Sequence, residues 1–319
     1  MNILILGHGV IGSIYGYIFQ QNDYHVRHLL RNNPTQKNGQ SININMLDGR
    51  YNKKGESYSG KYQVAFVNEL KKYDLIILSV GSGKLKSAIQ TLRANHIQGT
   101  VLLFCNFWSS REEINQLMTG FEYIIAFPVA GGRMNPTQLD CALFNHIMMD
   151  RKQNACAHNY NEIEQLFASV DIKVEKPHDM IEWIKIHMAI NAGVGITAAQ
   201  NSSLDNPSQL ATNLMNSAST LSNAIICIRE TLNIVASLNV NMKYYANELI
   251  PYKLPAKLAG LLMKRLFHHN ELTRRIMTLH SDVDDILYGC DCLYQAGKQH
   301  QVMAPHFYEQ YEAVRHLNF

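Results

Sequence analysis

The sequence lacks several features that would place it in particular classes of protein. It has no apolar run of about 18 residues, the length at which a helix can cross a bilayer. Its formal charge is only +3, whereas a nucleic-acid-binding protein normally carries a strong basic excess. Its six cysteines form no C-x-x-C pair, and its Cys and His residues form no pair of groups at the spacing of a zinc site. We therefore expect a soluble cytoplasmic protein with no membrane span, no nucleic-acid partner and no metal site.

The amino-terminal segment also lacks the features of a secretion signal. Residues Met1 to Phe19 are largely apolar, but no basic stretch precedes them and four glycines interrupt them (Gly7, Gly9, Gly12 and Gly16). This segment is therefore expected to be part of the folded protein.

The two halves of the sequence differ in the pattern of their apolar residues. In the first, short apolar runs alternate with segments of helical periodicity, a pattern that predicts βαβ units and a parallel sheet. In the second, the strand-like alternation disappears and long helical patterns take its place. Pro177 interrupts the pattern between them. We expect a Rossmann-type α/β dinucleotide-binding domain over residues 1–176 and an all-helical domain over residues 177–319.

The expected elements follow from these patterns. The predicted strands are Ile3–Leu6, His25–Leu30, Leu75–Val80, Val101–Cys105 and Tyr123–Phe127, with Asp140–Met149 and Asp171–Glu175 at the sheet edge. The polar segment Gln40–Tyr58 is expected to form loops and a small hairpin. The predicted helices of the second half are Ile181–Gln200, Ala211–Leu238, Leu254–Phe267 and Asp282–Gln299.

A glycine-rich motif follows the first predicted strand. Gly7-His8-Gly9-Val10-Ile11-Gly12 matches G-x-G-x-x-G and leads into a helical pattern. In such a motif the first glycine permits the turn, the second lets the backbone approach a pyrophosphate, and the third lets the helix pack on the strand. The pyrophosphate lies at the helix N-terminus, where free N–H groups favour an anion. A dinucleotide site is predicted here, and the alternative is a glycine-rich turn with no ligand.

The second predicted strand indicates which dinucleotide is bound. NAD enzymes usually place Asp or Glu about 20 residues after the motif, to hold the ribose 2′-hydroxyl, but Tyr24 to Leu47 contains no acid. Arg31 stands directly after His25–Leu30 instead, and an arginine there can hydrogen-bond a 2′-phosphate. The sequence therefore predicts NADP(H), unless Arg31 is simply a solvated surface residue.

Taken together, these motifs resemble the ketopantoate reductase (2-dehydropantoate 2-reductase) family. The opening from Asn2-Ile3-Leu4-Ile5-Leu6-Gly7 to Leu30-Arg31 is similar to the family's start, and Arg31 falls on the family's arginine for the 2′-phosphate. Leu103-Phe104-Cys105-Asn106 resembles the strand whose final asparagine lies beside the nicotinamide and the substrate. The resemblance implies an NADPH-dependent reductase of a small 2-keto acid, with a homodimer through the helical domain as a further option. The implied cofactor-binding residues are Gly7, His8, Gly9, Val10, Ile11, Gly12, Arg31 and Asn106.

The catalytic position departs from the family pattern. The family's lysine lies four residues before a helix asparagine, and four residues before Asn191 is His187. Positions four apart differ by only about 40° around a helix, whereas Lys185 lies roughly 120° away from Asn191. His187 is therefore the predicted proton donor, with Asn191 and Asn106 orienting the substrate carbonyl. The alternative for His187 is a hydrogen-bonded core histidine with no chemistry.

The family's catalytic glutamate also has a counterpart by resemblance. Alignment without a gap places Asp285 there, with Asp282 and Asp284 as rivals if the register shifts. Asp285 would accept a hydrogen bond from a substrate hydroxyl. The alternative is that all three aspartates form the solvated first turn of a helix, where the helix dipole favours acids.

Two further departures keep other functions open. Gly81 stands where the family has a second lysine, and Phe107-Trp108-Ser109 replaces glycines after Asn106. One alternative is a protein that binds or senses NADP(H) and has lost this chemistry. Another is a reductase of a different carbonyl substrate, accommodated by the bulky aromatic pair.

Overall fold

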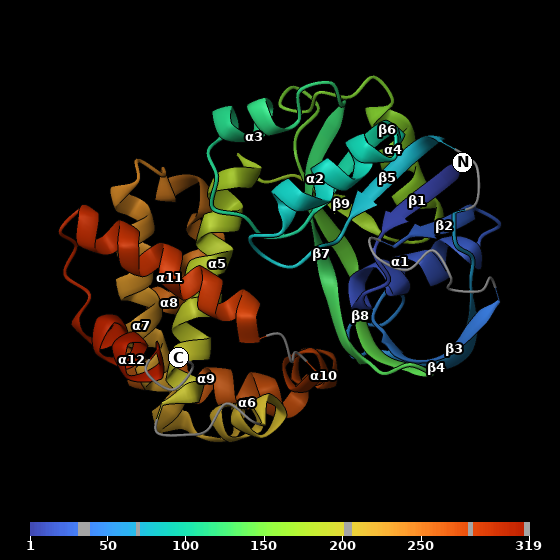
Figure 1. The fold of residues 1–319 in the computed structure, drawn as a ribbon. Coiled ribbons are helices and arrows are strands. Elements are labelled where there is room, and N and C mark those ends of the chain that lie inside the picture. The colour runs from blue at the N-terminus through green and yellow to red at the C-terminus, as the bar shows by residue number, and fades with distance from the viewer. Residues whose placement is uncertain (31–38, 68–70, 201–205, 280–282, 316–319) are drawn as a thin grey trace. The chain divides into compact units, whose positions relative to one another are not determined.

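The computed structural model describes residues 1–30, 39–67, 71–200, 206–279 and 283–315. The chain divides into two compact units, Met1–Ile181 and Glu182–Phe319. The first carries a sheet with helices and the second is helical, as the colours from blue to green and from yellow to red show (Figure 1). The predicted fold class, a Rossmann-type α/β region followed by an all-helical region, is confirmed.

The described residues of the first unit form a nine-stranded sheet. Its order is β2-β1-β5-β6-β7-β8-β3-β4, with β9 beside β8. The neighbouring strands in the series β2-β1-β5-β6-β7 are parallel. The pairs β7–β8 and β3–β4 are antiparallel. The strands are β1 (Asn2–Leu6), β2 (His25–Leu29), β3 (Gln40–Asp48), β4 (Glu56–Val64), β5 (Lys72–Leu78), β6 (Gln98–Phe104), β7 (Tyr123–Met134), β8 (Gln138–Met149) and β9 (Lys173–Glu175).

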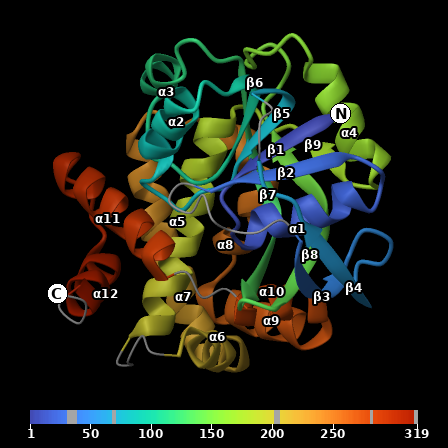
Figure 2. The ribbon, with the colours of Figure 1, turned by 45° about the vertical axis from the view of Figure 1, so that its right-hand side comes forward.

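The centre of this sheet is apolar on both faces because helices cover both. The side chains of Ile3–Leu6 are almost completely buried, as expected of a central parallel strand. The crossovers β1-α1-β2 and β5-α2-β6 run in opposite directions along the sheet, which places α1 (Val10–Gln20) and α2 (Leu85–Ala94) on opposite faces (Figure 2). On the α1 face, α4 (Tyr160–Ser169) adds Phe167, whose ring contacts those of Tyr15 and Phe19. A short helix, α3 (Arg111–Leu117), precedes β7.

The segment Gln40–Tyr58 is more regular than its polar composition predicted. The predicted hairpin is present but longer than expected: β3 and β4 pair over nine residues each, and β3 joins the main sheet beside β8. Ile42, Ile44 and Met46 are buried while the polar residues between them are exposed. This is the period-2 alternation of a strand with one covered face. The polar composition of the segment therefore predicted its structure less well than the spacing of its apolar residues.

The second unit contains a succession of helices. They are α5 (Met180–Ala199, which begins at the end of the first unit), α6 (Pro207–Asn216), α7 (Ala218–Ser237), a 3₁₀ turn (Met242–Tyr245), α8 (Ala246–Lys253), α9 (Ala256–His269), α10 (Glu271–Leu279), α11 (Val283–Gln299) and α12 (Pro305–Arg315). Among the helices in the described ranges, none is both long and apolar enough to cross a membrane.

One predicted helix is wrong in extent. Ala211–Leu238 is two helices, because Ser217 leaves the helical conformation at φ −112° and ψ 108°. Its hydroxyl accepts a hydrogen bond from the backbone N–H of Thr220, and it thereby caps α7. A serine in this role offers the backbone a local alternative to continuing the preceding helix.

Helix α5 packs against its neighbours at two glycines. A Cβ on Gly193 would lie 2.7 Å from the backbone nitrogen of Ile228 on α7, and one on Gly195 would lie 2.5 Å from Cγ2 of Ile286 on α11. The Thr231 hydroxyl of α7 donates to the carbonyl of Ala189 on α5 at 2.8 Å. The backbones of α5 and α7 therefore approach closely, and a side chain at position 193 would push them apart.

This packing predicts opposite effects of one substitution at two buried helical glycines. Gly193→Ala should lower the free energy of unfolding by about 1–3 kcal/mol, because backbone rather than a flexible side chain must move. Gly289→Ala on α11 should leave it unchanged or raise it by up to about 1 kcal/mol, because the new Cβ would lie 3.6 Å from the nearest atom of Met188 and alanine favours the helix. Urea unfolding of both variants beside the parent protein measures the difference. A Gly193→Ala protein as stable as the Gly289→Ala protein would contradict this account of the α5–α7 contact.

Candidate functional site

The glycine motif has the structure that the sequence predicts. β1 ends at Leu6, Gly7 turns the chain at φ +90°, and Gly9 caps α1 without any side-chain hydrogen bond. The Gly7 N–H donates to the carbonyl oxygen of Leu29. Among the described residues outside helices and strands, the N–H groups of His8 and Gly9 donate no backbone hydrogen bond. Unpaired N–H groups at a helix N-terminus favour an anion, so this loop can receive a phosphate group.

A buried histidine supports the loop from β2. His28 is fully buried, with Nδ1 at 2.7 Å from the Gly7 carbonyl oxygen and Nε2 at 2.7 Å from the Tyr62 hydroxyl on β4. A carbonyl oxygen only accepts, so Nδ1 carries the proton and Nε2 accepts from the Tyr62 O–H. Burial lowers the pKa of His28 to about 4, which keeps the ring neutral near pH 7 and so preserves this arrangement.

His8 completes the aromatic surroundings of the loop. Its ring meets those of His28 and Phe66 edge-on, at centroid distances of 5.2 and 6.0 Å. Its Nε2 is buried and forms no hydrogen bond with any described residue, and burial lowers the pKa of the ring. A buried ring nitrogen without a partner costs about 1–3 kcal/mol, a cost that a bound ligand could remove.

Asn106 lies just beyond the carboxyl end of β6. Its Oδ1 is buried and makes no hydrogen bond within the part of the chain that the structure describes. Parallel sheets of this type bind ligands beyond the carboxyl ends of their strands, so this acceptor is suitably placed. The next residue, Phe107, is almost completely buried. One half of the bulky Phe107-Trp108 pair therefore belongs to the core.

In the helical unit, the predicted catalytic pair is in direct contact. His187 and Asn191 lie one turn apart on α5, and the Asn191 amide donates to His187 Nε2 at 2.9 Å. One turn earlier, Trp183 stacks on the His187 ring at a centroid distance of 5.1 Å and an interplanar angle of 10°. The Trp183 N–H in turn donates to a Glu248 carboxylate oxygen on α8 at 2.9 Å. These contacts fix the orientation of the His187 ring from two sides.

The acidic candidates lie in the first turn of α11. Asp285 is half-buried and Asp284 is exposed. Ile286, the next residue, packs against Gly195, which lies one turn beyond Asn191 on α5. The first turn of α11 therefore lies beside the stripe that carries His187 and Asn191. Asp282 and Arg31 fall outside the described residues.

The predicted site thus has one part in each unit. The loop, His28 and Asn106 belong to the first, while His187, Asn191 and Asp285 belong to the second. The grouping of Asn106 with His187 and Asn191 in one cleft stays a prediction, as do the catalytic roles of these residues. Among the described residues, no three His, Cys, Asp or Glu side chains are grouped so that they could hold a metal ion.

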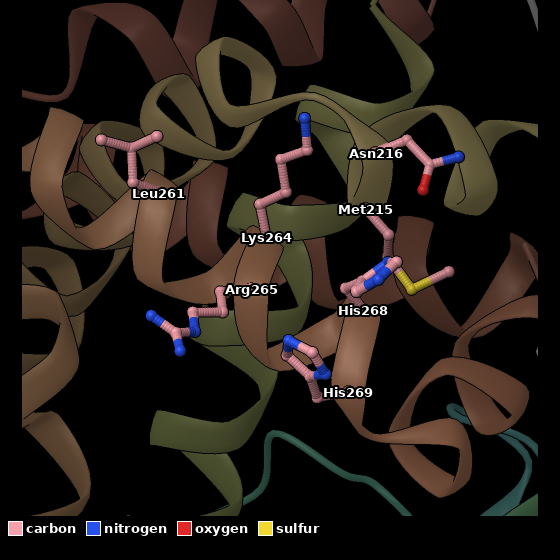
Figure 3. Close-up of a pocket in the computed structure, with 7 residues that line it drawn as sticks. All are labelled: Met215, Asn216, Leu261, Lys264, Arg265, His268 and His269. Carbon is pink, nitrogen blue, oxygen red and sulfur yellow. The ribbon is translucent and has the colours of Figure 1, made fainter.

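A hollow of about 240 Å³ in the helical unit is separate from these residues. It lies between the end of α6 and α9 (Figure 3) and is lined by Met215, Asn216, Leu261, Lys264, Arg265, His268 and His269. Basic side chains dominate the lining and it includes no carboxylate. None of these residues belongs to the predicted site.

Sequence reasoning missed the contribution of His28 and Tyr62. One signal was available: in His25–Leu29, position 28 shares a face with Val26, which is buried. A polar residue on the buried face of a strand is informative because it needs a partner. The partner itself, Tyr62, could not be identified because it comes from a strand 34 residues further along the chain.

Comparisons with known proteins support the resemblance to the ketopantoate reductase family. Residues 3–128 match the family model described as ketopantoate reductase PanE/ApbA. A dimeric ketopantoate reductase from Staphylococcus aureus has a similar structure, with a TM-score of 0.67, 13% identity, and coverage of 99% of this chain and 98% of that one. A probable 2-dehydropantoate 2-reductase from Bacillus subtilis gives 0.63 and 15% with full coverage of both chains. No curated protein sequence gives a match.

A third solved structure widens the set. D-mandelate dehydrogenase with NADH and anilino(oxo)acetate gives a TM-score of 0.65 at 15% identity, covering 99% of this chain and 98% of that one. The predicted resemblance to the ketopantoate reductase family is confirmed, by sequence over residues 3–128 and by fold over nearly the whole chain. At these identities the structural likeness establishes the fold alone.

The lowered pKa of His28 predicts a pH dependence of stability. The unfolded chain takes up a proton at the ordinary pKa of about 6.5 and the folded protein only near 4. The free energy of unfolding should therefore fall as the pH drops from about 6.5 towards 4, by roughly 2–3 kcal/mol from this group alone. His28→Asn should lose less stability than the parent protein between pH 7 and pH 4.5, by about that amount, in urea unfolding.

His25→Asn is the matched control, because His25 lies exposed on the same strand. Its loss of stability over this interval should match that of the parent protein. An equal loss in the parent protein and in His28→Asn would show that His28 does not titrate as its burial requires.

Proposed function

We propose that this protein reduces a small 2-keto acid with NADPH, in the manner of the ketopantoate reductases whose family model residues 3–128 match. The observation that carries the proposal is the phosphate loop, whose N–H groups at His8 and Gly9 have no partner among the described residues outside helices and strands. This loop opens a Rossmann-type unit, and a helical unit of the kind found in ketopantoate reductases follows it.

The residues of the first unit fit a dinucleotide. Gly7, His8, Gly9, Val10, Ile11 and Gly12 would hold the pyrophosphate, since the loop offers backbone N–H groups at the start of α1. The buried Oδ1 of Asn106 would accept a hydrogen bond at the nicotinamide end. Arg31 would bind the 2′-phosphate of NADP(H) through charge-assisted hydrogen bonds. When bound, the cofactor supplies the hydride.

The residues of the second unit would manage the proton and orient the substrate. Reduction of a carbonyl leaves an alkoxide, which needs a proton donor nearby. His187 would hold that proton, because histidine is the side chain that most readily exchanges a proton around neutrality. Trp183 and Asn191 keep the His187 ring in one orientation. Asn191 and Asn106 would orient the carbonyl, and Asp285 would accept a hydrogen bond from a substrate hydroxyl.

A second function is favoured by one observation. His187 replaces the family's lysine and already engages both Trp183 and Asn191, as a structural histidine would. In that case the protein binds or senses NADP(H) without reducing a keto acid. The two functions are separated by mixing the purified protein with NADPH and a panel of aliphatic and aromatic 2-keto acids and following the absorbance of NADPH. Binding of NADPH without consumption across the panel would favour the second function.

The proposed role of Arg31 predicts a preference between cofactors. NADPH should bind at least about tenfold more tightly than NADH, because a charged arginine meets the extra phosphate and no acid stands between Tyr24 and Leu47. Arg31→Ala should remove most of this preference by weakening NADPH binding alone. Titration of the protein fluorescence with each cofactor measures both constants. Equal affinities for NADPH and NADH in the parent protein would contradict the assignment.

The proposed role of His187 predicts a loss of turnover without a loss of cofactor. With a confirmed substrate, His187→Ala should lower kcat by about 10² to 10⁴, the usual contribution of a positioned general acid. The dissociation constant for NADPH should hardly change. Lys185→Ala is the control, because it lies two residues away on a different face of α5 and should leave kcat almost unaffected. An inactive Lys185→Ala beside an active His187→Ala would assign the chemistry to the lysine.

A further inference from the structure

We propose that Tyr62 and His28 are positioning residues for the phosphate loop, and that they set its affinity for the pyrophosphate of the dinucleotide. This inference rests on the proposed function, since it concerns how the same loop binds its ligand. It adds two residues from outside the glycine motif, one on β2 and one on β4.

His28 sets the orientation of the peptide group between Gly7 and His8. In the trans peptide that joins Gly7 to His8, the carbonyl oxygen and the N–H point in opposite directions. His28 Nδ1 donates to that carbonyl oxygen at 2.7 Å. The N–H of His8 therefore points away from His28, and no hydrogen bond of the described loops and turns occupies it. His28 thus selects which way this N–H is presented.

The two hydrogen bonds of the His28 ring form a chain with a single direction. Tyr62 donates to His28 Nε2, and His28 donates to the Gly7 carbonyl, so both bonds point the same way. Bonds in such a chain polarise one another. Drawing electron density towards the Gly7 oxygen makes the N–H of the same peptide a better donor to an anionic phosphate oxygen. The pair therefore improves the strength of this donor as well as its direction.

Close packing around Tyr62 holds this arrangement rigidly. Gly16 of α1 lies against Tyr62, and a Cβ there would stand 2.4 Å from the Tyr62 hydroxyl oxygen. The absence of that Cβ leaves room for the hydroxyl to reach His28. Both side chains are fully buried, so water does not compete for their hydrogen bonds. A replacement that cannot donate to Gly7 would leave that carbonyl free to turn.

The experiment compares two probes that share the adenosine 2′-phosphate and differ in the pyrophosphate. NADPH contains both groups, whereas adenosine 2′-monophosphate has no 5′ phosphate. His28→Leu removes the donor to Gly7, His28→Asn places an amide N–H where Nδ1 was, and Tyr62→Phe removes only the hydroxyl. Isothermal titration gives the dissociation constants, and circular dichroism with urea unfolding confirms that each variant is folded.

The expected result is specific to the pyrophosphate. His28→Leu should weaken NADPH binding by about tenfold or more while adenosine 2′-monophosphate changes by less than about twofold. His28→Asn should recover most of the affinity, and Tyr62→Phe should weaken NADPH binding by about threefold. Tyr58→Phe is the control on the same strand: it also loses a hydroxyl contact, the one from Tyr17 at 2.8 Å, but at an exposed side chain, and it should leave NADPH binding unchanged.

Two results would overturn the inference. Equal weakening of both probes in the folded His28→Asn and Tyr62→Phe proteins would indicate a general structural role. Unchanged NADPH binding in folded His28→Leu and in Tyr62→Phe would show that the loop needs no such positioning. A parent protein that binds adenosine 2′-monophosphate but gains nothing from the rest of NADPH would instead refute the proposed function, because the loop would then contribute no pyrophosphate site.

Discussion

The close approach of α1 to the sheet is the contact on which the rest of the amino-terminal unit depends. A Cβ at Gly12 would lie 2.7 Å from the Ile5 side chain, and one at Gly16 would lie against the Tyr62 hydroxyl. Two glycines one turn apart therefore let the helix rest directly on β1 and β4. This contact aims the start of the helix at the carboxyl end of β1, where unpaired N–H groups can meet an anion. Bulkier residues would lift the helix and move those groups away.

The features that could be predicted from the sequence are those written in a short stretch of chain. The glycine motif, the flanking strand and helix, and the stripe that joins His187 to Asn191 all follow from local spacing. The split between α6 and α7 could not be predicted in this way, because apolar periodicity continues across it and only the backbone of Ser217 departs. The extent of β3 and β4 depends on pairing with each other and with β8, about 95 residues further along. Such pairing leaves only a weak trace in local composition.

In the helical unit, the surroundings of His187 suit a flat ring better than a flexible charged chain. A lysine at 187 would need water or a carboxylate near its charged group. The histidine instead lies flat against Trp183 and accepts a hydrogen bond from Asn191, and Trp183 is fixed by Glu248 from α8. Aromatic stacking together with a hydrogen bond restricts a flat ring in a way that it cannot restrict a flexible aliphatic chain. These contacts therefore give the ring at position 187 one preferred orientation.

The place of His28 on β2 has a consequence for making chimeras. It stands only three residues before Arg31, on the segment that an engineer would exchange with a relative to alter the choice of cofactor. Transplanting the whole strand would carry away His28 but leave Tyr62 on β4, whose buried hydroxyl would lose its partner if the new strand supplied no acceptor. An unpaired buried hydroxyl costs about 1–3 kcal/mol, enough to make the hybrid fold poorly and to hide any gain in selectivity. A successful exchange would begin after Leu29, or would move the strand and its tyrosine as one unit.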